Sequence, residues 1–121
     1  MKDEYPAHYE HLKKLSAKLA RDLRGPMSAF AQLNAATSGP GALDVKTKQL
    51  IALGIGISVR CEGCIAYHVH DAIRAGATRQ EILETIGVAM MMGGGPAVVY
   101  ACQALEALDQ FESSGLVPTA P

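Results

Sequence analysis

The stretch "IALGIGISV", residues 51–59, decides between two fold classes. It alternates large aliphatic residues with Ala, Gly and Ser, and this period of two, taken alone, predicts a β-strand. The stretch follows Asp44, however, and Asp is a good N-cap for a helix that begins at Val45. The length from Asp44 favours a helix slightly, as do the small residues that would let a neighbouring helix approach closely. The segment itself leaves both structures open.

The N-terminal third of the chain predicts two helices. Leucines at spacings of three and four place the first helix over residues 8–24. Gly25 and Pro26 are expected to end it, and Pro26 suits the first position of a second helix over residues 26–36.

Three more helices are expected in the second half of the chain. One begins near Cys61 and stops at Gly76, because Gly is common just after a helix end. The sequence TRQE, residues 78–81, is a capping box that opens the next helix. Pro96 opens the last one after a run of three glycines, and residues 113–121 are expected to be a frayed tail. The apolar residues expected on the last two helices are Ile82, Leu83, Ile86, Val88, Ala89, Val98, Val99, Cys102, Leu105 and Leu108.

The composition fits a single all-α domain spanning residues 1–121. Hydrophobic residues make up 49% of the chain but aromatic residues only 5%, so the bulk comes from small and aliphatic helix formers. A net charge of −1 offers no electrostatic attraction for nucleic acid or an anionic membrane. The charge-free run of residues 85–105 is broken at its centre by Gly and Pro, which argues against a membrane span. The first residues lack the apolar segment of a signal peptide, so a cytoplasmic location is expected.

The motif Cys-x-x-Cys-x-x-x-His carries the chemistry that the sequence offers. On a helix that turns about 100° per residue, Cys61, Cys64 and His68 share one side, whereas His70 falls on the opposite face. A helix N-terminus stabilises a thiolate, and the spacing of three lets the two sulfurs form a disulfide. His68 is placed to take a thiol proton. These are the parts of a two-cysteine redox centre.

Two other interpretations of the thiols remain open. Free Cys is most often a buried hydrophobic residue. A zinc site would need a fourth ligand, for which Cys102 is a candidate in space, although taken alone Cys102 is expected to fill the core on the last helix. Three Cys is also an odd number, which argues against a structural disulfide framework.

A longer stretch carries a more specific signal. The sequence "LDVKTKQLIALGIGISVRCEGCIAYHVHDAIRAGATRQEILETIGVAMMMGGGPAVVYA", residues 43–101, resembles the alkylhydroperoxidase D / carboxymuconolactone decarboxylase family over roughly half of the chain. The resemblance implies an all-α bundle of about six helices with an alkylhydroperoxidase D-like fold, in which residues 51–59 are helical. It also implies an oligomer, commonly a homotrimer or homohexamer.

The resemblance further implies roles for four residues. In the peroxidase branch of the family, Cys64 would attack a hydroperoxide and become a sulfenic acid, Cys61 would close the disulfide, and His68 would relay protons. That branch carries a Glu where this chain has Gln49, and its well-studied members carry a His where this chain has Gly63. Gln cannot accept a proton as a base, which predicts slow peroxidase chemistry or a related disulfide-exchange role.

The sequence thus predicts a thiol-dependent peroxidase that needs no metal or cofactor and is reduced by a thiol or dithiol protein. One alternative is an enzyme of the decarboxylase type, with His68 as acid and base towards a small lactone or carboxylic acid. The other is a non-catalytic oligomeric or zinc-binding protein.

Overall fold

The structure, a computed structural model, describes residues 4–115, which form six α-helices and no β-strand. Residues 51–58 are helical, so the strand interpretation of this stretch is wrong and the all-α fold is confirmed. Asp44 is the N-cap, as expected, and its side chain accepts a hydrogen bond from the backbone N–H of Thr47 at 2.8 Å. The helices are α1 (Tyr5–Asp22), α2 (Arg24–Ser38), α3 (Val45–Ser58), α4 (Glu62–Arg74), α5 (Arg79–Gly93) and α6 (Gly95–Ser114).

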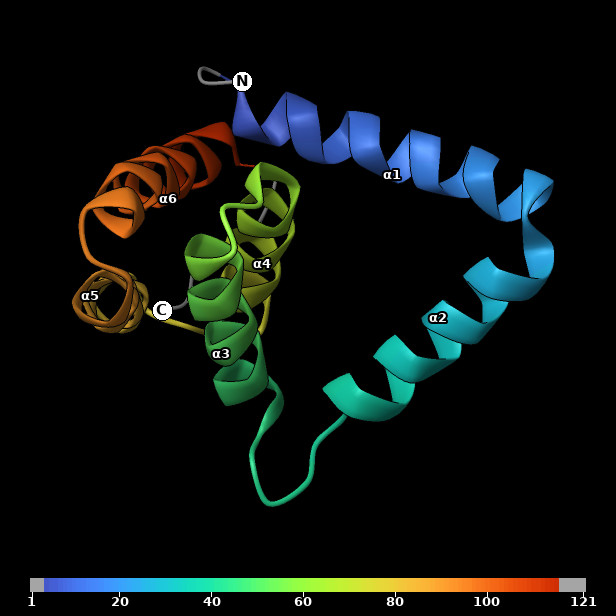
Figure 1. Ribbon diagram of the computed structural model, residues 1–121, viewed down its shortest axis with the longest axis horizontal. Helices are drawn as coiled ribbons and strands as arrows, with labels where there is room; N and C mark the ends of the chain where they lie inside the picture. Colours follow the sequence, from blue (N-terminus) through green and yellow to red (C-terminus); the bar gives the residue numbers. More distant parts are fainter. Residues whose placement is uncertain (1–3, 116–121) are drawn as a thin grey trace.

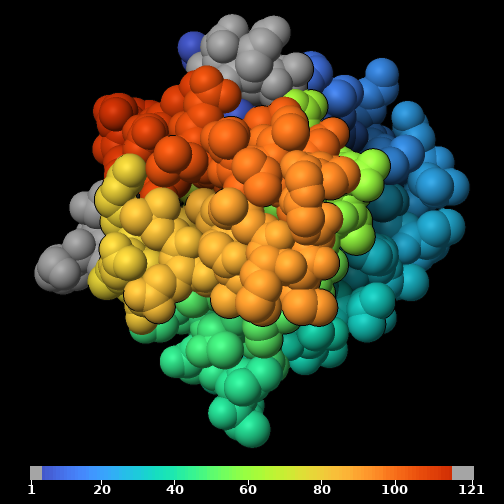
Figure 2. Space-filling view, turned by 60° about the vertical axis from the view of Figure 1, so that its left-hand side comes forward, coloured from blue at the N-terminus to red at the C-terminus, as the bar shows by residue number. Residues whose placement is uncertain are grey.

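Helices α3 to α6 pack into a bundle, and the start of α1 packs on α4 and α6 (Figure 1). Helix α3 lies mainly against α4 and α5, and α6 lies against α4 and α5. Figure 2 shows α5 and α6 side by side over one face of the molecule. The largest fully buried side chains are Tyr5, Leu53, Ile57, Ile65, Val69, Ile82, Leu108 and Phe111.

The buried face of α6 differs from the expected one. Val98, Val99, Cys102 and Leu105 are exposed, and only Leu108 of the expected set is buried. On α5, Val88 is exposed as well. The bundle instead receives a row of small residues, which lets α6 approach its neighbours closely and leaves the bulkier side chains outside. This row consists of Ala97, Ala101, Ala104 and Ala107.

The boundary between the first two helices also differs from the expected one. Helix α1 begins at Tyr5, three residues before the expected start, and the chain breaks at Leu23 (φ −137°, ψ 64°). Gly25 and Pro26 therefore lie in the first turn of α2, where Pro is tolerated because its missing N–H would have no partner inside the helix.

The glycine run separates α5 from α6, as expected. Gly94 has φ 70°, a conformation that favours glycine. A Cβ on Gly93 would lie 2.5 Å from the Cβ of Ala97, so this close turn also excludes a side chain at residue 93. The expected frayed tail is helical as far as Ser114, and residues 116–121 lie outside the described part of the chain.

Residues 13–38, the far part of α1 together with α2, form an arm that extends from the bundle (Figure 1). No residue of α2 is buried. The arm carries exposed apolar side chains on both helices and at the break between them: Leu15, Leu19, Leu23, Phe30 and Leu33.

Candidate active site

The two cysteines of the motif meet at the N-terminus of α4. Cys61 is the N-cap of this helix, and its Sγ accepts a hydrogen bond from the backbone N–H of Cys64 at 3.1 Å. The same two residues form a disulfide, with their Cα atoms 5.1 Å apart. The sulfurs therefore lie at the helix N-terminus, where backbone N–H groups stabilise negative charge on a thiolate.

Two glycines shape the surroundings of the disulfide. A Cβ on Gly56 of α3 would lie 3.0 Å from the Cβ of Cys64, so the lack of a side chain lets α3 and α4 approach at the cysteine. A Cβ on Gly63, between the cysteines, would lie 3.0 Å from Cδ1 of Leu12 on α1. Leu12 thus occupies the space over Gly63, and a larger residue at 63 would require Leu12 to move.

His68 lies on the side of α4 that faces α3 and contacts Gln49. Its Nδ1 is 2.8 Å from Oε1 of Gln49. Because an amide oxygen only accepts hydrogen bonds, Nδ1 carries the proton and Nε2 keeps its lone pair. The Gln49 amide therefore sets the tautomer in which Nε2 can accept a proton.

Burial lowers the pKa of His68 below its usual value, while the nearby Asp71 carboxylate acts in the opposite direction. The imidazole is therefore largely neutral at neutral pH. A neutral imidazole is the form that can accept a proton from a thiol.

A cavity of about 290 Å³ adjoins this pair, lined by Val45, Gln49, Asp71, Arg74 and Ala75. Gln49 belongs both to this cavity and to the contact with His68. The cavity therefore connects Gln49, the partner of His68, with Asp71 and Arg74 near the end of α4.

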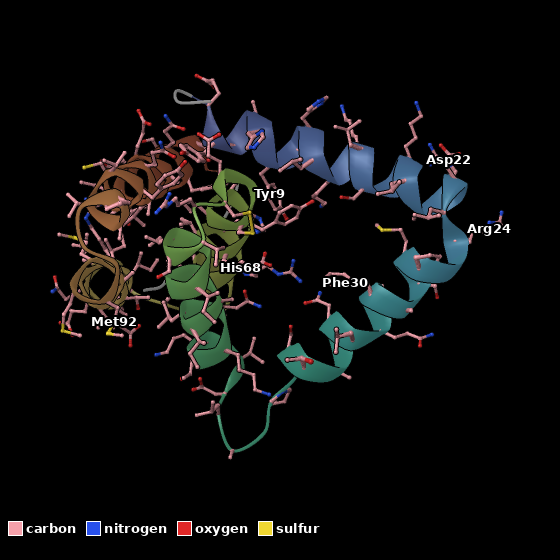
Figure 3. All side chains as sticks on the ribbon, in the orientation of Figure 1. Tyr9, Asp22, Arg24, Phe30, His68 and Met92 are labelled. Carbon is pink, nitrogen blue, oxygen red and sulfur yellow. A yellow bond between two sulfur atoms is a disulfide. The ribbon has the colours of Figure 1, made fainter. Side chains whose placement is uncertain are left out.

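The second imidazole of the motif lies on the opposite face, as the helical spacing predicts. His70 is buried, and its ring stacks on Tyr9 of α1 with 4.0 Å between centroids (Figure 3 labels Tyr9 and His68). Its Nδ1 lies 2.7 Å from Oδ1 of Asp71. His70 therefore holds α1 on α4 and lies away from Cys61 and Cys64.

The motif and the family resemblance point to Cys61, Cys64, His68 and Gln49, and the structure places all four at the contact between α3 and α4. Neither signal points to Asp71, Tyr9 or Leu12. The spacing of three between His68 and Asp71 was visible as a helical neighbour pair, whereas the contacts of α1 depend on how helices distant in the sequence pack.

Cys102 lies on an exposed part of α6, outside the disulfide. The core-filling role expected for it is therefore wrong. Within residues 4–115, no group of three or more His, Cys, Asp and Glu side chains is arranged to hold a metal ion. Over the same residues, no helix is both long and apolar enough to span a membrane.

Residues 26–107 match the description of the carboxymuconolactone decarboxylase family. The chain belongs to this family. Proteins with similar sequences include an uncharacterised protein of the cox locus of Paracoccus denitrificans, 40% identical over 85% of this chain and 96% of that protein. An uncharacterised protein of Haemophilus influenzae is 35% identical over 86% of this chain and 92% of its own length.

Solved structures of this family share the fold. An apo family member from Legionella pneumophila aligns with a TM-score of 0.86 and 39% identity, over 91% of this chain and 98% of that one. A family member from Thermotoga maritima, described as having a suggested part in the antioxidative response, aligns with a TM-score of 0.78 and 31% identity, over 88% and 90% of the two chains. The helical bundle of this chain is thus a carboxymuconolactone decarboxylase family fold.

Proposed function

We propose that this protein is a thiol peroxidase that reduces organic hydroperoxides or hydrogen peroxide through a Cys61–Cys64 disulfide. The observation that carries the proposal is the position of this disulfide at the N-terminus of α4, with the His68–Gln49 pair on the adjoining turns. A family member described in connection with the antioxidative response adds support.

In the first step, the Cys64 thiolate attacks the outer oxygen of the hydroperoxide. A sulfur–oxygen bond forms, the oxygen–oxygen bond breaks, and the leaving alkoxide takes a proton and departs as the alcohol. Neutral His68 accepts the thiol proton at Nε2 and returns it to the leaving oxygen. Cys64 is left as a sulfenic acid.

In the second step, the Cys61 thiolate attacks the sulfur of that sulfenic acid. The disulfide forms, the sulfur–oxygen bond breaks, and the hydroxide leaves as water after taking a proton. The two thiols supply the two electrons that reduce the peroxide, so the reaction needs no metal or cofactor. An external thiol or dithiol protein then reduces the disulfide.

The proposal also includes the domain organisation, the cellular location and the assembly of the protein. We place the whole chain in a single domain that acts in the cytoplasm, where a reductant keeps returning Cys61 and Cys64 to thiols. We further propose a homotrimer or homohexamer, because the arm and the outer faces of α3, α5 and α6 expose many large apolar side chains.

Counting free thiols tests the chemistry. The fully reduced protein has three thiols, and one molar equivalent of peroxide should remove two of them. Cys64→Ser should abolish the peroxide-dependent loss of the pair. Cys102→Ser is the matched control, because this exposed thiol lies outside the disulfide, and the variant should still lose two thiols. Unchanged thiol counts in the wild-type protein would refute the peroxidase.

The family description supports a second candidate function, a decarboxylase-type enzyme acting on a small lactone or carboxylic acid. His68 would then act as acid and base, and the thiols would only pack. In that case Cys61→Ser should retain turnover of the lactone, and peroxide should not inhibit it.

A zinc-binding protein is the remaining alternative. Stoichiometric zinc in protein purified without chelator, lost in Cys64→Ser, would favour it.

A further inference from the structure

Gln49 leaves the proposed peroxidase without a carboxylate on α3. The amide orients His68 through the 2.8 Å contact with Nδ1, but it cannot take up or release a proton. An ionised group must therefore come from elsewhere if one assists His68.

Asp71 is a candidate by its position in the fold. It follows His68 by three residues on α4, so the two side chains are neighbours on the surface of one helix. Asp71 and Gln49 line the same cavity of about 290 Å³. The cavity is large enough for several water molecules, each of which occupies roughly 30 Å³ in the liquid.

Asp71 is the carboxylate that acts on His68. Charged and titratable groups surround Asp71 on α4 and α1, and Glu10 of α1 is a second carboxylate that acts on Tyr9. On α4, Oδ1 of Asp71 lies 2.7 Å from Nδ1 of His70, and Arg74 lines the same cavity. From α1, Tyr9 faces both Asp71 and Arg74, and each of them affects the pKa of this phenol, although burial affects it most.

From α3, the cavity receives only Val45 and Gln49, which are uncharged. Lys46 of the same helix points away and bonds Glu81 at 2.9 Å. No carboxylate of α3 therefore competes with Asp71 for this role.

We propose that Asp71 is a positioning residue of the peroxidase site, which acts on His68 from α4 and replaces the carboxylate that Gln49 removes from α3. The expected effect on the oxidation rate rests on the proposed function. The expected effect on the pKa of His68 does not, because it can be measured without turnover. The carboxylate strengthens His68 as a proton acceptor during attack by Cys64, and His68 then returns the same proton to the leaving alkoxide. Asp71 neither takes up nor gives up a proton in either step, so the proton balance of the reaction is unchanged.

The direction of its electrostatic effect agrees with this role. Asp71 opposes the burial that lowers the pKa of His68. Removing the charge should weaken the base, which lowers the plateau of the pH–rate profile and moves its lower limb to lower pH.

Asp71→Asn tests the inference, because the amide oxygen can still accept the hydrogen bond from Nδ1–H of His70. The first measurement is an NMR titration of the His68 ring in the oxidised protein, which needs no catalytic activity. We expect a lower pKa for His68 in the variant than in the wild type. An unchanged pKa overturns the inference even if the protein proves to be an active peroxidase.

The second measurement is stopped-flow oxidation of the reduced protein between pH 5 and 9. We expect roughly a threefold to tenfold lower plateau and a lower limb that moves to lower pH, less than the 10²–10⁴-fold loss typical of removing a direct general base. A lower plateau with an unmoved limb would mean a structural effect and would overturn the inference.

Three further variants make the result specific. Asp22→Asn changes an acid at the tip of the arm, far from His68 in Figure 3, and should leave both measurements unchanged. His70→Gln should also leave the limb in place, and a shift equal to that of Asp71→Asn would assign the effect to the His70 contact instead. The double variant Gln49→Glu/Asp71→Asn returns the carboxylate to α3 and should recover the lost rate. If the double variant recovers none of the lost rate, a carboxylate on α3 cannot do the work of Asp71 on α4, which would contradict the inference.

Discussion

Helices α2 and α4 have similar lengths and opposite environments. Helix α4 buries six residues: Ile65, Ala66, Val69, His70, Ala72 and Ile73. Helix α2 buries none, although Phe30 and Leu33 are 65% and 60% exposed and as apolar as anything in α4. Hydrophobic residues at helical spacing therefore predict a helix, but not the surface that covers it. Helix α4 is covered by α1, α3 and α6 of the same chain. Its contact with α3 also contains the candidate site.

The largest expected difference between these helices is in stability. Ile65→Ala removes a fully buried side chain from α4 and should lower the free energy of unfolding by about 2–5 kcal/mol. Leu33→Ala on α2 is the matched control and should change it by less than about 0.5 kcal/mol in the monomer. Urea unfolding monitored by circular dichroism measures both values. Equal losses would show that α2 is as well covered as α4.

A smaller loss is expected where α4 meets α3. Gly56→Ala would place a Cβ 3.0 Å from the Cβ of Cys64, which is held in the disulfide and has little freedom to move. We expect destabilisation of about 1–3 kcal/mol, together with slower closure of the disulfide. Gly87→Ala on α5 is the control, since nothing lies within 4 Å of the added Cβ. Unfolding curves that show no difference between the variants would contradict the close packing at Cys64.

His68 should make the stability of the protein depend on pH through α4, which is buried, and not through α2. The pKa of His68 is lower in the folded than in the unfolded protein because of burial, so the unfolded state binds more protons as the pH falls. The contribution of His68 is thus complete above the usual pKa of about 6.5 and is lost as the pH falls towards the folded value. Thermal unfolding of the oxidised protein between pH 8 and 5 should show this loss, and His68→Gln should reduce its slope. The same slope in both proteins would exclude His68 as the cause.

The smallest effect on the isolated chain is expected for Phe30→Ser on the arm. The side chain contributes little to the folded monomer, so its unfolding free energy should change by less than about 0.5 kcal/mol. If another subunit covers the arm, as we propose, the variant should shift light-scattering masses towards smaller species. Lys18→Ser, at an exposed polar position of the arm, is the control. An unchanged mass distribution would leave α2 without a role in assembly.

The candidate site could be predicted from the sequence to the extent that it is local. Cys61, Cys64 and His68 lie within eight residues, and one helix dictates their common side. Gln49 follows only from the family resemblance, and its contact with His68 arises from the packing of α3 against α4. The spacing of Asp71 from His68 on α4 can be read from the sequence. That Asp71 and Gln49 line one cavity follows only from the tertiary structure.

By itself, the sequence determined the capping of α3 by Asp44, the capping box at Thr78 and Glu81, and the Cys-x-x-Cys motif at the start of α4. These features depend on groups within a few residues of one another, so hydrogen bonding and spacing are enough to define them. Only the tertiary structure decided that α6 buries its alanines and exposes Cys102, and that Leu12 fills the space over Gly63. Helix period specifies which residues share a face, but the face that becomes buried depends on which side chains let two helices approach most closely.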